Sequence, residues 1–258
     1  FLKDITFKPP ANYNFAFDVL DELAKKCPDK SAMVWLSNTK EKRVFTFAEI
    51  SKLSSKAANY LKSLGIGKGD KVILVLKRHY QFWFILNALH KLGAVAIPAS
   101  NLLTAHDFEY RLNAAGIKAA ICTVDNDIPK HLDEGSVNAP TLEVKISVNG
   151  KVEGWHDFDS EFEAYPDTFE RPADQSIDDP MLMYFTSGTT GHPKIAVHSF
   201  AYPLGHIVTA RYWHNVDPNG LHFTVSDTGW GKAVWGKIYG QWMCEAAVFT
   251  YDFDKFDA

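Results

Sequence analysis

Cysteine is scarce in this sequence, which excludes two classes of protein. The 258 residues include three cysteines, Cys27, Cys122 and Cys244, and no two of them have C-x-x-C spacing. Small secreted domains held by disulfides, and zinc modules built on cysteine, need more cysteines at closer spacing. We therefore expect reduced, mostly buried thiols and a cytoplasmic protein.

Long apolar runs and a large charge of either sign are also missing. The stretch from Phe82 to Leu89 is interrupted by Asn87 and is far shorter than the ~20 residues that span a bilayer. We interpret it as a helix buried within the protein. A net charge of -4 gives no electrostatic reason to expect nucleic acid or an anionic membrane as a partner. We expect no nucleic-acid partner and no transmembrane segment, and the composition indicates no oligomeric state.

Helix and strand patterns alternate along most of the chain. Residues 46–49 form a capping box that starts one helix, and Thr104 starts another. Short apolar runs between the helical patterns have the length and composition of buried strands. This alternation predicts an α/β fold with layered open sheets, largely parallel and flanked by helices. The expected strands are 31–36, 43–45, 71–76, 94–97, 118–123, 181–185, 195–197, 221–225 and 246–251, and the expected helices are 14–26, 46–64, 80–92, 104–115, 200–214 and 234–243.

The order of these elements suggests two parts. We expect an N-terminal α/β subdomain over residues 1–175 and the start of a second α/β subdomain over residues 176–258. Residues 125–180 are expected to be a less regular connection, in which Asn149-Gly150 predicts a hairpin turn. The paired carboxylates of residues 178 and 179 precede a proline, which favours solvated turn residues over a metal or acid–base pair.

The candidate site is the polar stretch from Tyr184 to Lys194, Y-F-T-S-G-T-T-G-H-P-K, between two expected strands. Its glycines allow positive φ and close approach of the backbone, so that consecutive N–H groups can surround an anion. Its hydroxyls and the Lys194 ammonium add donors and charge. These properties predict a cradle for a polyphosphate, whereas composition alone leaves a plain polar hairpin loop equally open. The predicted phosphate-binding residues are Thr186, Ser187, Gly188, Thr189, Thr190, Gly191 and Lys194.

Three other motifs are excluded by their spacing. Two residues separate Gly191 from Lys194, so the stretch is not a Walker A loop. The glycines at 65, 67 and 69 follow a helix and precede a strand, which is the reverse of a dinucleotide fingerprint and indicates a helix end and a turn. Ser187 lacks the G-x-S-x-G elbow of a hydrolase nucleophile.

The histidines of the second half form no metal motif. None belongs to an H-E-x-x-H sequence, and three of them, spaced eight residues apart, are expected to form a spread surface stripe. We therefore expect no metal ligands in this chain. The histidines considered are His192, His198, His206, His214 and His222.

A second loop follows an expected strand, at the place where ligands gather in open α/β sheets. It reads S-D-T-G-W-G-K from Ser226 to Lys232. Its tryptophan, Trp230, is either a residue that contacts a ligand or simply part of the core, as most tryptophans largely are.

These motifs together resemble a known family. The string T-S-G-T-T-G-H-P-K resembles the phosphate-loop signature of the AMP-forming adenylating enzymes, which include acyl-CoA synthetases, nonribosomal peptide adenylation domains and luciferases. F-T-F-A-E-I (45–50) and L-G-A-V-A-I-P (92–98) resemble earlier family motifs. Trp230 after S-D-T-G looks most like the medium-chain acyl-CoA synthetases. The resemblance implies that Trp230 and Gly231 bind the acyl substrate.

The resemblance also implies a reaction in two steps. A carboxylic acid, expected to be a fatty acid, would attack the α-phosphorus of ATP and give an acyl-adenylate and pyrophosphate. The thiol of coenzyme A would then attack the acyl carbon and release AMP. The predicted loop would hold the β- and γ-phosphates, and Mg²⁺ would share that load.

Family members are about twice as long as this chain. We therefore expect the N-terminal part of the adenylate-forming fold, with the adenylation lysine and the C-terminal domain beyond Ala258. No catalytic residue is expected within the chain, nor synthetase activity from the chain by itself. Two alternatives stay open: a module that binds a nucleotide or phosphate without catalysis, and an adenylating enzyme that loads a carrier protein or oxidises its adenylate.

Overall fold

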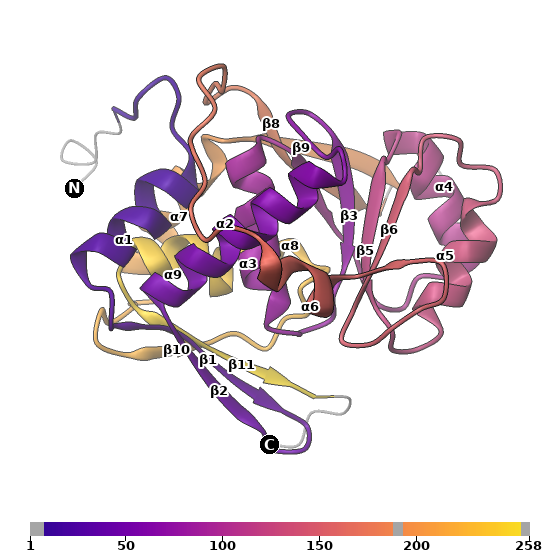
Figure 1. The fold of residues 1–258 in the computed structure, drawn as a ribbon. Helices are drawn as coiled ribbons and strands as arrows, with labels where there is room; N and C mark the ends of the chain where they lie inside the picture. Colours follow the sequence, from indigo (N-terminus) through magenta and orange to yellow (C-terminus); the bar gives the residue numbers. More distant parts are fainter. Residues whose placement is uncertain (1–7, 188–192, 254–258) are drawn as a thin grey trace.

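Two open β-sheets flanked by helices organise the computed structural model, which describes residues 8–187 and 193–253 (Figure 1). Among the described residues, the larger sheet has seven strands in the order β7-β6-β5-β3-β4-β8-β9, and the smaller has four in the order β10-β11-β1-β2. The strands are β1 (Ser31–Ser37), β2 (Lys42–Thr46), β3 (Lys71–Val75), β4 (Val95–Pro98), β5 (Ala119–Thr123), β6 (Val144–Val148), β7 (His156–Asp157), β8 (Pro180–Thr186), β9 (Lys194–Ser199), β10 (Leu221–Phe223) and β11 (Ala247–Asp252).

Parallel pairing dominates both sheets. In the larger sheet, β3 pairs in parallel with β4 and β5, β8 with β4, and β6 with β5 and β7. In the smaller sheet, β11 pairs in parallel with β10 and β1. The antiparallel pairs are the hairpins β1–β2 and β8–β9. The expected α/β class with largely parallel sheets is therefore confirmed.

The helices begin and end largely where the local sequence signals place them. Thr46 Oγ1 accepts a hydrogen bond from Glu49 N at 3.2 Å and Glu49 Oε2 accepts one from Thr46 N at 2.7 Å, which completes the expected capping box. Gly93 ends α3 with a φ of 70°, a conformation that glycine adopts without strain. The helical segments are η2 (Ala16–Leu20), α1 (Asp21–Lys26), α2 (Phe47–Ser63), α3 (Gln81–Leu92), α4 (Ala105–Ala115), α5 (Ile128–Ser136), α6 (Phe158–Glu161), η3 (Phe162–Ala164), α7 (Tyr202–Tyr212), α8 (Gly231–Lys237) and α9 (Tyr239–Met243).

Every residue of helix α3 is buried. Its apolar side chains belong to a core cluster that also contains Met33 and Val248 of the smaller sheet and Leu74 and Leu182 of the larger one. Burial of apolar surface on all sides of α3 therefore stabilises both sheets at once. The interpretation of residues 82–89 as an internal helix is confirmed.

Two expectations about the middle of the chain need correction. Residues 125–180 are more regular than expected, since they contain α5 and β6, and β6 pairs with β5 along its whole length. Asn149 and Gly150 do adopt positive φ, but the hairpin is wrong, because β7 pairs with β6 in parallel. Asn149 N donates to Asp159 Oδ2 at 2.6 Å. After this turn the chain runs back along the sheet, and β7 then pairs with β6 in the same direction.

The sheets also do not follow the division expected near residue 175. Strands β8 and β9 complete the larger sheet, whereas β1 and β2, from the beginning of the chain, pair with β11 near its end. The expected helix over 234–243 is broken at Ile238, which has φ −139° and ψ −79°, so that α8 and α9 are separate helices. Helix α8 also begins earlier than expected, directly after Trp230.

A buried ion pair anchors α1 to the helices of the core. The side chain of Lys91 on α3 is 1% exposed, and its Nζ lies 2.9 Å from Asp21 Oδ1 on α1. We predict that Asp21→Ala lowers the free energy of unfolding by roughly 3–5 kcal/mol, because it leaves a buried ammonium without its counter-charge. Urea unfolding followed by tryptophan fluorescence measures this. The matched control is Glu22→Ala, which removes the exposed Glu22–Lys25 pair and should leave the unfolding midpoint nearly unchanged. Equal effects of the two variants would contradict the prediction.

Candidate functional site

The candidate site lies at one edge of the larger sheet. Because β3, β4, β5 and β8 are parallel, their C-terminal ends lie at the same edge. Ligands of open α/β sheets bind at this edge, in the loops that follow the strands. The polar stretch after β8 therefore extends from the edge where a site is expected.

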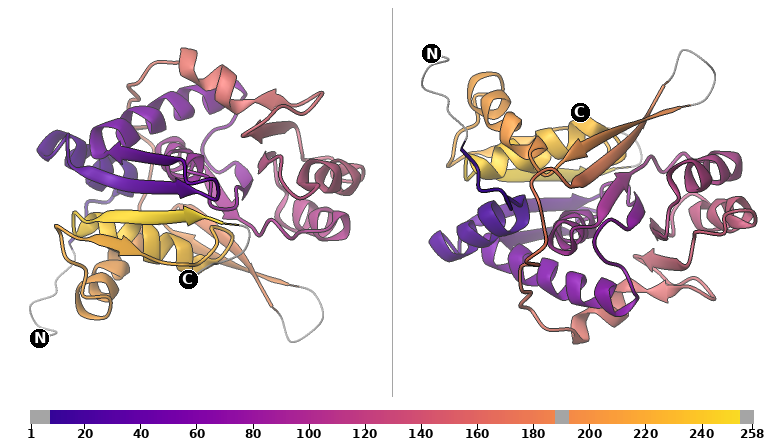
Figure 2. Two further views of the ribbon diagram at one scale, coloured as in Figure 1. Left: turned by 90° about the horizontal axis from the view of Figure 1, so that it is seen from below. Right: turned by 90° about the horizontal axis from the view of Figure 1, so that it is seen from above.

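The ends of the predicted phosphate loop are open to solvent. Thr186 closes β8 and Lys194 opens β9, and the two are cross-strand partners in the β8–β9 hairpin. Thr186 Oγ1 donates to the Lys194 carbonyl at 3.4 Å, and Thr186, Ser187 and Lys194 are exposed. The hairpin projects beyond the helices that flank the sheet (Figure 2). Gly188, Thr189, Thr190 and Gly191, the other predicted members, and His192 lie outside the described residues.

A second loop with predicted ligand contacts is held against the end of β3. The N–H of Thr228 donates to the Lys77 carbonyl at 3.3 Å, and the Thr228 hydroxyl donates to the same oxygen. Gly229 packs against the backbone of the loop after β4, so closely that a Cβ there would lie 2.4 Å from the carbonyl carbon of Ala99. Trp230 comes next and is 65% exposed. The alternative that Trp230 serves as core is therefore excluded.

A pocket of about 160 Å³ lies between the end of β8 and the loop that carries Trp230. Phe185, the residue before Thr186, forms one wall, and Trp230 forms another. Gly231 lies just beyond, beside β8, where a Cβ would approach the Tyr184 ring to 3.9 Å. The structure thus brings the predicted acyl-binding residues close to the stem of the predicted phosphate loop. The pocket is lined by Pro98, Ala99, Ser100, Leu103, Arg111, Phe185, Gly229 and Trp230.

The residues after β3 form a charged cluster that the sequence interpretation missed. His79 Nε2 lies 2.8 Å from Asp125 Oδ2, which follows β5, and His79 Nδ1 lies 3.2 Å from Asp252 Oδ2 on β11. The hydrogen bond from His79 lowers the pKa of Asp125 to about 2. His79 therefore links the larger sheet to the smaller one. The signal in the sequence was the run K-R-H directly after an apolar strand, since polar residues at strand ends gather at this edge.

Arg78, in the same cluster, approaches the second loop. Its Nη1 lies 3.9 Å from Asp227 Oδ2, one residue before Thr228. Burial raises the pKa of Asp227, while Arg78 and a hydrogen bond from Gly229 N act in the opposite direction. The loop that presents Trp230 is thus fixed at its base by both charge and backbone contacts.

Four of the histidines lie together, and the expected surface stripe is wrong. The centroid of the His198 ring lies 4.1 Å from that of Tyr202, and the Tyr202 ring meets the His206 ring edge-on at 4.5 Å. The Trp235 ring stacks on both His206 and His214, with centroid distances of 6.2 Å and 5.4 Å. Helix α7 ends at Tyr212 and the chain turns back into β10, which places His222 5.2 Å from His214. We call this arrangement the histidine ladder; it comprises His198, Tyr202, His206, Trp235, His214 and His222.

The described residues form no metal-binding cluster and no membrane-spanning helix. Within residues 8–187 and 193–253, no three His, Cys, Asp or Glu side chains are grouped so that they could hold a metal ion. The described donors near the loop are hydroxyls, which suits a Mg²⁺ ion that arrives with nucleotide phosphates better than a resident one. In the same part of the chain, no helix has both the length and the apolar character needed to cross a membrane.

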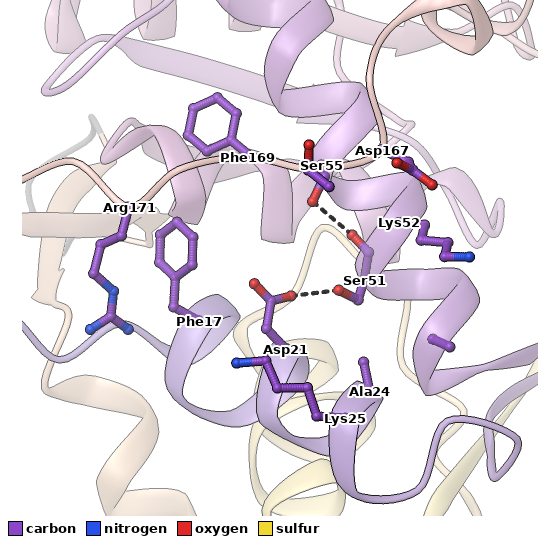
Figure 3. A pocket seen from close by; sticks show the side chains of 12 residues that line it. Phe17, Asp21, Ala24, Lys25, Ser51, Lys52, Ser55, Asp167, Phe169 and Arg171 are labelled. Carbon is purple, nitrogen blue, oxygen red and sulfur yellow. Dashed lines mark hydrogen bonds between the residues drawn. The ribbon is translucent and has the colours of Figure 1, made fainter.

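A larger pocket, of about 420 Å³, lies away from this edge between α1, α2 and residues 167–171 (Figure 3). Asp21 points toward Ser51, whose hydroxyl donates to it at 2.6 Å. Two of the charged groups that line this pocket already have partners, since Asp21 pairs with Lys91 and Arg171 pairs with Asp18. Pocket size alone therefore does not locate the candidate site, and the strand-end edge does.

The histidine ladder predicts loss of stability in acid. Burial lowers the pKa of all four ladder histidines, and His198 and His214 lower that of His206 further, to about 4. The folded state thus resists protonation, so stability is fully present above the ordinary histidine pKa of about 6.5 and is lost as the pH falls toward 4. We expect the urea midpoint of the wild-type protein to fall over this pH range. His206→Phe keeps an aromatic ring beside Trp235 but removes the titrating group, so the midpoint should depend less steeply on pH in this variant. Identical pH profiles for the two proteins would contradict this.

The close packing at Gly229 predicts a sensitive position. Gly229→Ala places a methyl group 2.4 Å from backbone atoms of Ala99 and Ser100, so the Trp230 loop or the loop after β4 must shift. We expect a loss of roughly 1–3 kcal/mol in the free energy of unfolding. Differential scanning calorimetry measures this as a lower Tm. Gly67→Ala is the matched control, because a Cβ at Gly67 meets no atom within 4 Å, and its Tm should stay at the wild-type value.

Known proteins are similar to this chain over nearly its whole length. A family model described as AMP-binding enzyme matches residues 20–256. The acyl-coenzyme A synthetase ACSM4, mitochondrial, of Homo sapiens is 33% identical over 256 residues, covering 96% of this chain and 44% of the relative. Acyl-coenzyme A synthetase ACSM5, mitochondrial, of Mus musculus is 35% identical over 257 residues, with the same shares of 96% and 44%. The chain therefore spans about half the length of the curated relatives it matches.

Solved structures share the fold. The anthranilate CoA ligase AuaEII, in complex with anthranoyl-AMP, superposes with a TM-score of 0.83 at 24% identity, over 95% of this chain and 46% of that one. The acyl-CoA synthetase of Brucella canis gives a TM-score of 0.85 at 18% identity, over 97% and 45%. With the family model matched from residue 20 to residue 256, the chain belongs to the family of AMP-binding enzymes.

Proposed function

We propose that this chain is the N-terminal portion of an ATP-dependent, AMP-forming acyl-CoA synthetase. The observation that carries the proposal is the position of Thr186, Ser187 and Lys194, exposed at the C-terminal edge of the larger sheet beside the pocket at Trp230. A polyphosphate and a carboxylic acid bound there would lie next to each other. The curated relatives are named acyl-coenzyme A synthetases, which supports the same chemistry.

The chain's own contribution would be binding and charge stabilisation. The hydroxyls of Thr186, Ser187, Thr189 and Thr190, the Lys194 ammonium and the amides of Gly188 and Gly191 would hold the β- and γ-phosphates of ATP. They would offset the charge that builds on pyrophosphate as it leaves. Mg²⁺ bound with the nucleotide would neutralise part of the same charge.

The acid would bind at the second loop. Trp230 and Gly231 would pack against the acyl group and direct its carboxylate toward the α-phosphorus. A free carboxylate does not acylate thiols, whereas its mixed anhydride with AMP does, so the thiol of coenzyme A would react in a second step. A fatty acid is the proposed substrate. The adenylation lysine would lie beyond Ala258, and we propose that this chain forms no acyl-CoA by itself.

The cytoplasmic location expected from the cysteines stays a prediction, since the relatives that match are named mitochondrial proteins. The structure records all three cysteines as free thiols, and burial raises the pKa of Cys122 and of Cys244.

The test is an assay of the full-length protein with ATP, Mg²⁺, coenzyme A and a panel of short-, medium- and long-chain and aromatic acids. We expect acid-dependent release of pyrophosphate and equal amounts of AMP and acyl-CoA. Lys194→Met should lower kcat/KM for ATP by roughly 10- to 100-fold, because a charge-assisted contact to a phosphate is lost. Lys25→Met, at an exposed lysine on α1, is the matched control and should match wild type.

Other outcomes separate the alternatives. ATP binding without turnover, with every acid, would indicate a binding module. Pyrophosphate release without acyl-CoA would indicate transfer to a carrier protein, or oxidation of the adenylate.

A further inference from the structure

The β8–β9 hairpin leaves the larger sheet before it reaches the phosphate loop. Strand β8 pairs with β4 at a single position, Ala96 with Leu182, while its pairing with β9 continues to Thr186 and Lys194. The end of the hairpin thus has no neighbouring strand on the β4 side among the described residues. A two-stranded hairpin is marginally stable by itself, so its direction depends on other contacts.

Those contacts come from two adjacent residues of α4. The Tyr110 hydroxyl donates to the Pro193 carbonyl at 2.8 Å, at the residue before β9 begins. The Tyr110 ring also meets the Phe185 ring edge-on, with centroids 6.1 Å apart. Arg111 lies over the same ring, with Cζ 5.2 Å from its centroid. Helix α4 therefore contacts the chain at Phe185, one residue before Thr186, and at Pro193, one residue before Lys194.

Arg111 is itself held in place by the start of its helix. Its Nη1 lies 3.1 Å from Asp107 Oδ1 and 3.2 Å from the Asp107 carbonyl. The other carboxylate oxygen of Asp107 accepts from Thr104 N at 3.0 Å and from the Thr104 hydroxyl at 2.8 Å. The helix cap thus orients the guanidinium, and the guanidinium orients Phe185. Arg111 is also the charged residue in the wall of the pocket beside Trp230.

We propose that Tyr110 and Arg111 are positioning residues that fix the two ends of the phosphate loop for ATP. The inference rests on the proposed function for its substrate. Holding both ends at a set separation lowers the ordering cost that a flexible loop would otherwise incur on binding, which is the general advantage of preorganisation. Neither residue needs to touch the nucleotide for this effect.

The test compares variants of the full-length protein in two measurements. Tyr110→Phe keeps the ring and removes the hydrogen bond to Pro193, and should raise KM for ATP about three- to tenfold with KM for the acid unchanged. Arg111→Lys keeps the charge and loses the planar contact with Phe185, and should also raise KM for ATP. Tyr165→Phe is the matched control: it removes a hydroxyl contact to Ser63 far from the hairpin and should leave both constants at wild type.

Hydrogen–deuterium exchange of the same proteins without substrate gives a readout that does not depend on activity. Faster exchange at Thr186 and Lys194 in Tyr110→Phe, with an unchanged Tm, supports the inference even if no acid is adenylated. Unchanged exchange in Tyr110→Phe overturns it, whatever the activity. Absence of acid-dependent pyrophosphate release in the wild-type protein overturns only the proposed function.

Discussion

Parallel pairing of β3, β4, β5 and β8 is the constraint on which the candidate site depends. Parallel strands bring their C-terminal ends to one edge, so the loops that follow them meet there whatever their distance along the chain. Strand β8 joins this edge through one pair with β4, although residues 99–179 separate the two strands. That single alignment places the phosphate-loop stem opposite the loop that carries Trp230.

Beyond the strand pairs, the C-terminal ends of the strands are held in place by ion pairs and by contacts between aromatic rings. His79 contacts carboxylates from both sheets, and Lys77 and Arg78 hold the base of the Trp230 loop. Buried charges of this kind are stable only with their partners present, so the cluster favours one arrangement of the two sheets over others. The histidine ladder contacts β8 as well, since the ring centroids of Tyr184 on β8 and His198 on β9 lie 6.2 Å apart.

Much of the fold was predictable where the signal is local. Capping residues, glycine at helix ends and short apolar runs act within a few neighbours, and they located α2, α3, α4 and the strands β3 to β5. The prediction failed where contacts between residues far apart in the sequence determine the path of the chain. Asn149 and Gly150 both have positive φ, yet Asn149 N contacts Asp159 and the next strand, β7, pairs with β6 in parallel. Ile238 carries no breaking signal in the sequence, yet the helix is interrupted at this fully buried residue.

The sequence by itself determined the family, the α/β class and the order of chemistry-bearing loops, because these depend on ordered motifs and local periodicity. Only the tertiary structure decided which strands share a sheet, since pairs such as Met33 with Val248 form between opposite ends of the chain. It likewise decided that Trp230 is exposed, that four histidines lie together with Tyr202 and Trp235, and that α4 contacts the β8–β9 hairpin. Each of these follows from packing between segments that no short window of sequence contains.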